Sequence, residues 1–337
     1  MGRVAVRSTV AALAVVLSLV AATGAGAAIV TASDGQGRTI TFDVRASNVD
    51  TSWYAAVLSA TAHGNEISNV TVRIVRDQAI EGLCGSEAAA CYTRIAGQPT
   101  IMIPAGKNQF IEGTLVHEYG HHIDASTPVT GVPELNGTPA WWAARGMAAL
   151  FASHQVAFNY SMGWDHSIAE IFAEDYAYIH VGPTYRYAIT WMSPPDDALK
   201  ATMFAELGTP TQALPAAPNT PLVVHRVGTL GPRGRKLVPF GLLGPGRHVT
   251  FTATVSRAQR KGVRARIQVV CNGTVAGTRT IGRGQTSRTL DLPSMGPGDC
   301  DARLISAAPV SLKYTLRLQL QAPDQGTRVL ATGRLAR

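Results

Sequence analysis

The sequence contains few cysteines and few charged residues, and both shortages narrow the class of protein. No Cys-x-x-Cys pair occurs, which excludes a cysteine metal site of the common spacing. Charged residues make up 15% of the chain against 46% hydrophobic residues, so a disordered chain is excluded. There is no internal repeat, no nucleic-acid recognition motif and no second long apolar run after the amino-terminal one. At 337 residues we expect two soluble domains.

The amino-terminal segment has the three parts of an export signal. Two arginines precede an apolar stretch at residues 9–22, and residues 25–27 read Ala-Gly-Ala, which fits a small-residue cleavage rule. We therefore expect residues 1–27 to be a cleaved signal peptide and the protein to be secreted. A retained membrane anchor is the alternative, because no charge occurs from residue 8 to residue 33. No cysteine lies near the cleavage site, so a lipoprotein is not expected.

The four cysteines of the chain are Cys84, Cys91, Cys271 and Cys300. An even number in an exported chain predicts disulfide bonds. Three pairings are possible, and the local pairs Cys84–Cys91 and Cys271–Cys300 would each lie within one expected domain.

Charge and proline content divide the chain into parts. Residues 29–207 carry 9 Lys or Arg against 18 Asp or Glu, whereas residues 208–337 carry 19 against 4. Residues 208–222 contain four prolines and no charge, which predicts a semi-extended linker. We therefore expect one domain at 28–207 and a basic one at 223–337.

The first domain is predicted to be α+β, because short alternating runs precede helical patterns. The expected elements are strands at 39–44, 70–75 and 100–103, and helices after a cap at Asp50, through residues 117–121, and over 136–158 and 167–179. The second domain shows repeated alternation punctuated by Gly and Pro. Expected strands at 249–255, 264–270, 312–320 and 327–330 predict an all-β, sandwich-like domain or a barrel.

The His-Glu-Tyr-Gly-His motif at 117–121 is the strongest signal for chemistry. His117 and His121 are four residues apart, so on a helix their imidazoles can converge on one ion. Glu118 is placed to take a proton from a zinc-bound water, as in metallopeptidases. Gly120 permits another element to approach closely. The alternative is a solvated polar helix face with no ion.

A third ligand must come from elsewhere in the chain, because catalytic zinc takes three protein ligands. The metzincin pattern would need Gly at position 124 and His at 127, where this chain has Asp124 and Thr127. Glu170 and Glu174 share one face of a later helix, so one carboxylate can bind zinc and the other can orient a ligand histidine. The alternative is an acidic stripe that faces solvent.

Residues 117–124, His-Glu-Tyr-Gly-His-His-Ile-Asp, followed by Glu-Ile-Phe-Ala-Glu at 170–174, resemble the gluzincin metallopeptidases. They are most similar to the branch that contains the catalytic domains of anthrax lethal factor and Pro-Pro endopeptidase. The resemblance covers residues 109–178 and implies a zincin-like fold and a Zn²⁺ cofactor. It also implies that Glu170 is the ligand and that Glu174 lies behind the ligands.

One departure from that branch concerns the residue that stabilises the oxyanion. The branch carries a tyrosine about two helical turns before the ligand glutamate, and the matching position here is Gly163. Tyr160 and His166 are the nearest candidates for this catalytic role, although they can equally be a core and a surface residue. Asp124 can orient a histidine or cap the end of the motif helix.

These patterns predict a secreted, monomeric zinc endopeptidase that acts on a protein or peptide, with Glu118 as general base. A non-catalytic binding or adhesion protein that retains the zincin fold, and a zinc amidase acting on cell-wall peptides, are the alternatives. The basic domain fits an anionic cell-surface polymer as partner rather than nucleic acid, or has no dedicated partner. Its expected cations are Arg233, Arg235, Lys236, Arg257, Arg260, Lys261, Arg264 and Arg266.

Overall fold

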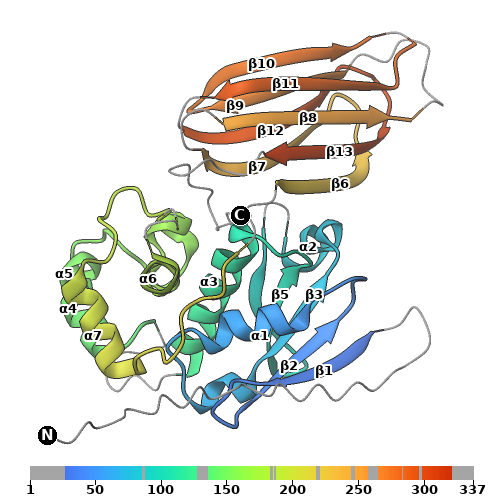
Figure 1. Cartoon of the computed structure of the whole chain (residues 1–337). Coiled ribbons are helices and arrows are strands. Elements are labelled where there is room, and N and C mark those ends of the chain that lie inside the picture. The colour runs from blue at the N-terminus through green and yellow to red at the C-terminus, as the bar shows by residue number, and fades with distance from the viewer. Residues whose placement is uncertain are drawn as a thin grey trace, which may run out of the picture.

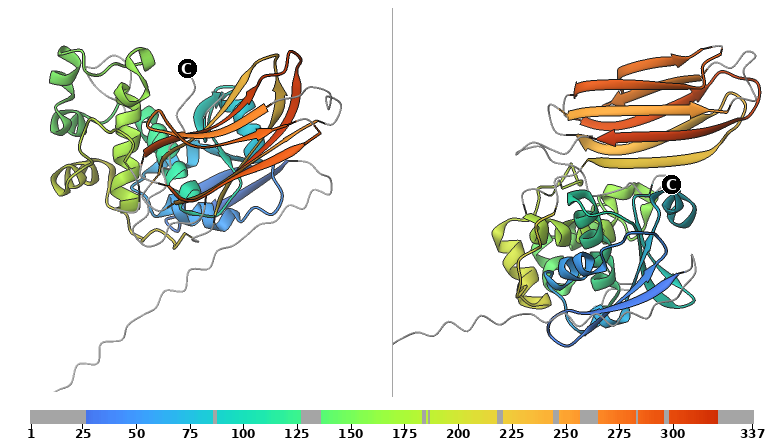
Figure 2. Two further views of the ribbon diagram at one scale, coloured as in Figure 1. Left: turned by 90° about the horizontal axis from the view of Figure 1, so that it is seen from above. Right: turned by 45° about the vertical axis from the view of Figure 1, so that its right-hand side comes forward.

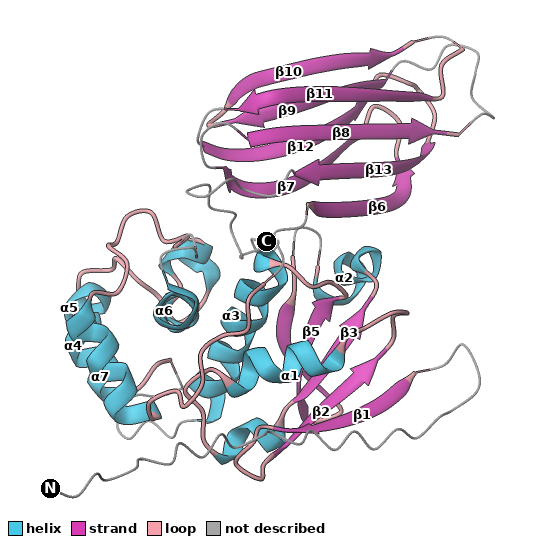
Figure 3. Cartoon of the chain, viewed as in Figure 1, coloured by secondary structure: helices cyan, strands magenta, loops and turns pink. Residues whose placement is uncertain are grey.

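The computed structural model describes residues 27–85, 88–126, 136–182, 185, 187–217, 221–243, 247–256, 265–282, 284–295 and 298–320. A part with helices around one sheet is followed by two stacked sheets (Figures 1 and 3). Three expectations lie outside the described residues: the leader up to residue 26, the strand at 327–330, and the cations Arg257, Arg260, Lys261 and Arg264. Among the described helices, none combines the length and apolar character that a membrane crossing requires.

The sheet of the first part has five strands in the order β1-β2-β3-β5-β4. The central strands β2, β3 and β5 run parallel, and the edge strands β1 and β4 are antiparallel to their neighbours. The three strands expected from alternation are all present, whereas β1 and β4 were not expected. Their bounds are β1 Ala28–Ser33, β2 Thr39–Val44, β3 Thr71–Val75, β4 Cys91–Ile95 and β5 Gln98–Pro104.

Most helices lie to one side of this sheet, whereas α2 lies at its end next to the sandwich (Figure 1). Asp50 caps the first helix as expected, because its side chain accepts a hydrogen bond from the Trp53 backbone N–H. The helices are α1 Thr51–Ser59, α2 Asp77–Cys84, α3 Gln109–Ser126, α4 Pro139–Arg145, α5 Met147–Ala152, α6 Ile168–Val181 and α7 Asp197–Leu207. Short 3₁₀ turns are η1 Asn65–Asn69, η2 Tyr160–Met162 and η3 Trp164–His166.

The expectation of one continuous helix over residues 136–158 is wrong. Gly146 takes a left-handed conformation, with φ of 66° and ψ of 30°, and separates α4 from α5. A helix commonly ends at a glycine in this conformation, because glycine has no Cβ to clash. Helix α5 then stops at Ala152, and the chain turns back toward the start of α6.

The second part is a sandwich of two four-stranded antiparallel sheets, ordered β10-β9-β12-β7 and β11-β8-β13-β6. Along β8, Val249, Phe251 and Ala253 are fully buried between the sheets, so the alternation seen in the sequence is the burial pattern. The strands are β6 Leu222–Leu230, β7 Arg235–Leu243, β8 Arg247–Val255, β9 Ala265–Cys271, β10 Thr274–Ile281, β11 Ser287–Met295, β12 Gly298–Ser306 and β13 Leu312–Leu320.

Helix α2 lies next to the edge strand β6 of the sandwich (Figures 1 and 2), and ion pairs join the two parts there. Arg226 Nη1 lies 2.8 Å from Asp77 Oδ2, and the Lys236 ammonium pairs with Glu81. The backbone N–H of His225 also donates to Asp77, at 2.8 Å. Lys236, expected to contribute to a free basic surface, is thus engaged within the chain.

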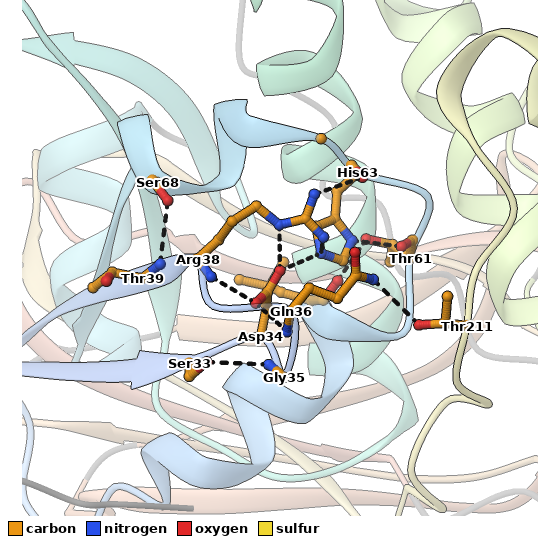
Figure 4. A network of polar contacts seen from close by, with 12 residues as sticks. Ser33, Asp34, Gly35, Gln36, Arg38, Thr39, Thr61, His63, Ser68 and Thr211 are labelled. Carbon is orange, nitrogen blue, oxygen red and sulfur yellow. Dashed lines mark hydrogen bonds and ion pairs between the residues drawn. The ribbon is translucent and has the colours of Figure 1, made fainter.

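A buried polar network ties the β1–β2 turn to the loop that follows α1 (Figure 4). Asp34 accepts hydrogen bonds from the backbone N–H groups of Gln36 and Arg38 and pairs with the Arg38 guanidinium. Burial acts to raise the pKa of Asp34, but these hydrogen bonds outweigh it and lower that pKa to about 2. His63 lies 3.2 Å from the same carboxylate, and its Nδ1 lies 2.6 Å from the Thr61 carbonyl oxygen.

The same loop is held from its other side by α6. The Tyr176 hydroxyl donates to the Ala62 carbonyl at 2.6 Å, and the Ala62 N–H donates to Nε2 of His180 at 2.8 Å. Burial lowers the pKa of His180 to about 4, so its ring is neutral at pH 7 and Nε2 can accept this bond. The loop therefore anchors α6 to the sheet.

Candidate metal centre

Helices α3 and α6 pack at unusually close range where Gly120 faces α6. A Cβ built at Gly120 would lie 3.0 Å from the Ala173 Cα and 3.2 Å from the Tyr176 Cβ. No side chain fits there without a shift of one helix, so the close approach expected from Gly120 is present. Leu115, Val116 and Tyr119 of α3 are fully buried, which fixes the helix in the core.

This helix pair brings together the three residues that the sequence singled out as ligands. Nε2 of His117 lies 3.2 Å from Oε2 of Glu170, and Nε2 of His121 lies 3.3 Å from the same oxygen. One donor atom from each residue falls within 4.8 Å of the other two. His117, His121 and Glu170 therefore form a group that can hold a metal ion.

The charges around this group favour a cation. Burial acts to raise the pKa of Glu170, but the positive charge of His121 and hydrogen bonds from both histidines hold that pKa below its ordinary value. Burial acts to lower the pKa of His117, yet Glu170 and Glu174 raise it to about 10. The carboxylates that stabilise a proton on His117 would equally stabilise a bound cation, so the residues fit a metal.

Glu174, for which the resemblance implied a place behind the ligands, contacts the ring of His117. Its Oε1 is 3.1 Å from Nδ1 of His117, on the side of the ring away from Glu170. The carboxylate is itself fixed by the Tyr185 hydroxyl at 2.7 Å and the Ala188 N–H at 2.8 Å. A carboxylate in this position orients a ligand histidine and raises its basicity.

Glu118, the expected general base, is buried beside the two histidines. Burial raises its pKa, and the charges of His117 and His121 act in the opposite direction. The backbone N–H of Tyr92, on edge strand β4, interacts with its carboxylate. Glu118 thus lies between the ligand pair and the edge of the sheet.

The two candidates for the oxyanion donor have different environments. The Tyr160 hydroxyl donates to Oε1 of Glu170 at 2.7 Å, so this residue belongs to the site. His166 instead stacks on Trp191, with ring centroids 4.8 Å apart, and its Nδ1 lies 2.6 Å from the Gln155 carbonyl oxygen. The structure therefore brings Tyr160 to Glu170 of the candidate metal group, and the described contacts of His166 lie elsewhere.

Asp124 and His122 support the helix rather than the donor group. Asp124 accepts a hydrogen bond from the backbone N–H of Gly137, and burial raises its pKa to about 6. Nε2 of His122 lies 2.9 Å from the Glu66 carbonyl oxygen, on another face of α3. The contact of Asp124 joins the last turn of α3 to the segment before α4, and it is neither a contact with a histidine nor a cap on the backbone of α3.

Two further residues near the site were not expected. The Trp164 indole stacks on the His117 ring, with centroids 6.1 Å apart and 26° between the planes. Asp175 pairs with Arg145 and accepts a hydrogen bond from Nε1 of Trp141 at 2.7 Å, which fixes α4 to α6. Asp175 could have been found from the sequence, because it is an acidic residue next to Glu174 in a largely apolar helix. Trp164 could not, because no spacing in the sequence relates it to the motif.

Both expected disulfides are present, and one of them borders the site. Cys271–Cys300 joins directly opposed residues of β9 and β12. Cys84–Cys91 joins the end of α2 to the start of β4. The next residue, Tyr92, has its hydroxyl 3.3 Å from Nδ1 of His122. Two disulfides indicate an extracellular or periplasmic protein.

Comparison with known proteins assigns no family. No family model and no curated protein matches the chain. The structure of PliG, a periplasmic inhibitor of g-type lysozyme from Aeromonas hydrophila, is similar over 30% of this chain and 87% of its own, with 13% identity and a TM-score of 0.21. The CBM36-1 domain of a xylanase from the hindgut metagenome of Trinervitermes trinervoides covers 31% and 99%, with 12% identity and a TM-score of 0.23. Likenesses this weak carry no functional inference.

Proposed function

We propose that this protein is an exported zinc metallopeptidase with a zincin-like, gluzincin-type catalytic domain. The observation that carries the proposal is the convergence of His117, His121 and Glu170 within 4.8 Å, with the buried Glu118 beside them. Two histidines and one glutamate are a ligand set of catalytic zinc. The resemblance of residues 117–124 and 170–174 to gluzincins agrees with it.

The chain's own groups supply the remaining chemistry of peptide hydrolysis. Zinc in such a site lowers the pKa of water and polarises a carbonyl group. His117, His121 and Glu170 would hold the ion, and Glu174 would keep the His117 ring oriented. Glu118 would take the proton from the attacking water and pass it to the leaving amine nitrogen. Its buried position keeps competing bulk water away from that transfer.

The arrangement of the first part supports the zincin-like fold. The motif helix α3 packs between the mixed sheet and α6, and the antiparallel edge strand β4 lies next to it (Figure 1). An edge strand at the site offers backbone groups with which an extended peptide can pair. A peptide substrate is therefore the class that this geometry fits best.

The test separates hydrolysis from metal binding. In Glu118→Gln we expect hydrolysis of a peptide library to fall about 10²–10⁴-fold while zinc content stays at one ion per chain. In Glu170→Gln we expect the zinc content itself to fall. A zinc-loaded wild-type protein that cleaves no peptide would support the non-catalytic alternative, and cleavage restricted to cell-wall peptides would support the amidase.

The sandwich is proposed to bind an anionic cell-surface polymer. Arg233, Arg235 and Arg266 are exposed on it, and their charges are of the sign that such a polymer requires. Binding of the full chain to a poly(glycerol phosphate) column should weaken as salt increases, and an Arg233→Gln/Arg235→Gln double variant should elute earlier. Elution identical to that of wild type would contradict this assignment.

A further inference from the structure

A peptidase of the proposed kind needs a donor for the oxygen of the carbonyl under attack, because that oxygen gains negative charge in the transition state. The tyrosine position of the resembling branch is Gly163 here. The Tyr160 hydroxyl is already used by Glu170, and Nδ1 of His166 already lies 2.6 Å from a backbone carbonyl. Neither candidate therefore offers an uncommitted donor.

An uncommitted donor does lie beside the metal ligands. Nε1 of Trp164 is buried and has no hydrogen-bond partner among the described residues. The same indole ring stacks on the imidazole of His117, which places it against a ligand of the candidate ion. Buried N–H groups without a partner are rare in folded proteins, because their lost hydration is not repaid.

We propose that the indole N–H of Trp164 donates to the oxygen of the scissile carbonyl during peptide hydrolysis. This inference rests on the proposed peptidase function and adds to it a catalytic residue. A donor kept away from bulk water makes a stronger hydrogen bond to a developing oxyanion than a hydrated donor does. The cost of leaving it unpaired in the free protein is then recovered in the transition state.

The proposal requires a small local movement when substrate binds, because the indole nitrogen of Trp164 is buried in the free protein. Trp164 opens the short turn η3, and Gly163 directly before it has φ of 117°, a conformation that residues with a Cβ rarely adopt. Residues at the ends of short elements are those that absorb a change of backbone angles when enzymes close on a substrate. Catalytic hydrogen bonds often form only when substrate is bound.

The chain supplies a matched control, because Nε1 of Trp53 in α1 is also buried without a described partner. Trp164→Phe and Trp53→Phe each remove one orphan indole N–H and retain an aromatic ring. Both variants should keep the wild-type zinc content and a melting temperature equal to or above that of wild type. Only Trp164→Phe should lose activity, with kcat lowered about 10²–10³-fold and KM nearly unchanged.

An inhibitor measurement gives a second readout. A phosphonamidate peptide presents tetrahedral phosphoryl oxygens in place of the reacting carbonyl, and it should bind Trp164→Phe more weakly by a similar factor. Wild-type kcat in Trp164→Phe, or loss of its zinc or its fold, would overturn the assignment. If wild type hydrolyses peptides and Glu118→Gln does not, any of these results for Trp164→Phe contradicts only the role of Trp164 and leaves the peptidase function standing. If wild type is inactive when loaded with zinc, the peptidase proposal itself fails.

Discussion

Tyr160 donates a hydrogen bond of 2.7 Å to Oε1 of Glu170, while Oε2 of the same carboxylate faces the two histidines. The two oxygens of Glu170 therefore have separate tasks. One is available to an ion, and the other is held by a phenol from the turn η2. Tyr160 is itself 44% exposed, so this contact lies at the boundary between the site and solvent.

Tyr160→Phe is expected to weaken zinc binding about 10–100-fold, because the ligand carboxylate loses the group that orients it. Competition with a chelator of known affinity measures the change. Tyr178→Phe, which removes a phenol from α6 without a described contact to a ligand, should bind zinc like wild type. Equal zinc affinity in both variants would show that Glu170 is oriented by its helix alone.

The two disulfides should differ in what their removal changes. Cys84–Cys91 closes 7 residues and Cys271–Cys300 closes 29, so loop entropy predicts losses of about 2 and about 4 kcal/mol in the unfolding free energy of their respective parts. Nevertheless, Cys84→Ser/Cys91→Ser should reduce hydrolysis, because Tyr92 then loses its fixed position beside Glu118 and His122. Cys271→Ser/Cys300→Ser should leave hydrolysis unchanged. A reversed order in the activity assay would refute this assignment.

The ion pairs between α2 and the sandwich should set how firmly the two parts are docked. Glu81→Lys places like charges together at Lys236 and should increase the rate at which a protease cuts residues 208–217. Adding Lys236→Glu should restore the wild-type rate, with a coupling energy of about 1 kcal/mol. Asp291→Lys, an exposed change elsewhere on the sandwich, serves as control. If the Glu81→Lys/Lys236→Glu double variant is cut as fast as Glu81→Lys alone, this ion pair does not hold the two parts together.

His180 should make the protein less stable in mild acid. Its pKa is about 4 in the fold and about 6.5 in the unfolded chain, so between these values the unfolded state binds the additional proton. The free energy of unfolding that depends on a neutral His180 is fully present above pH 6.5. It falls by up to about 3 kcal/mol as the pH is lowered toward 4. Chemical denaturation across this range measures the slope, and His180→Gln, which keeps an acceptor for Ala62, should flatten it. An unaltered slope would assign the acid sensitivity to other groups.

The metal group was predictable because its parts obey local rules. The four-residue spacing of His117 and His121 and that of Glu170 and Glu174 each define one helix face before any tertiary contact is known. The sequence predicted disulfides and left three pairings open, and the structure forms the two local pairs, Cys84–Cys91 and Cys271–Cys300. Strict alternation likewise located β8 and β13 in the sandwich.

The remaining structure depends on contacts that no local pattern encodes. Strand β10 is exposed along most of its length, so its sequence shows no alternation to reveal it. The break at Gly146 lies inside a run of good helix formers, and only the left-handed backbone there ends α4. The stacking of Trp164 on His117 joins residues 47 positions apart, and the position of that indole is set by how η3 packs against α3.

Because the imidazoles come from α3 and the carboxylate from α6, an ion bound by this group would be held between two helices rather than within one of them. At Gly120 the two helices are so close that a Cβ would lie 3.0 Å from the Ala173 Cα, so the donors on α3 and α6 are held together by direct helix packing. Zinc should escape to a chelator when this packing opens. The rate of metal release therefore measures how often α3 and α6 separate locally, and this measurement requires no substrate.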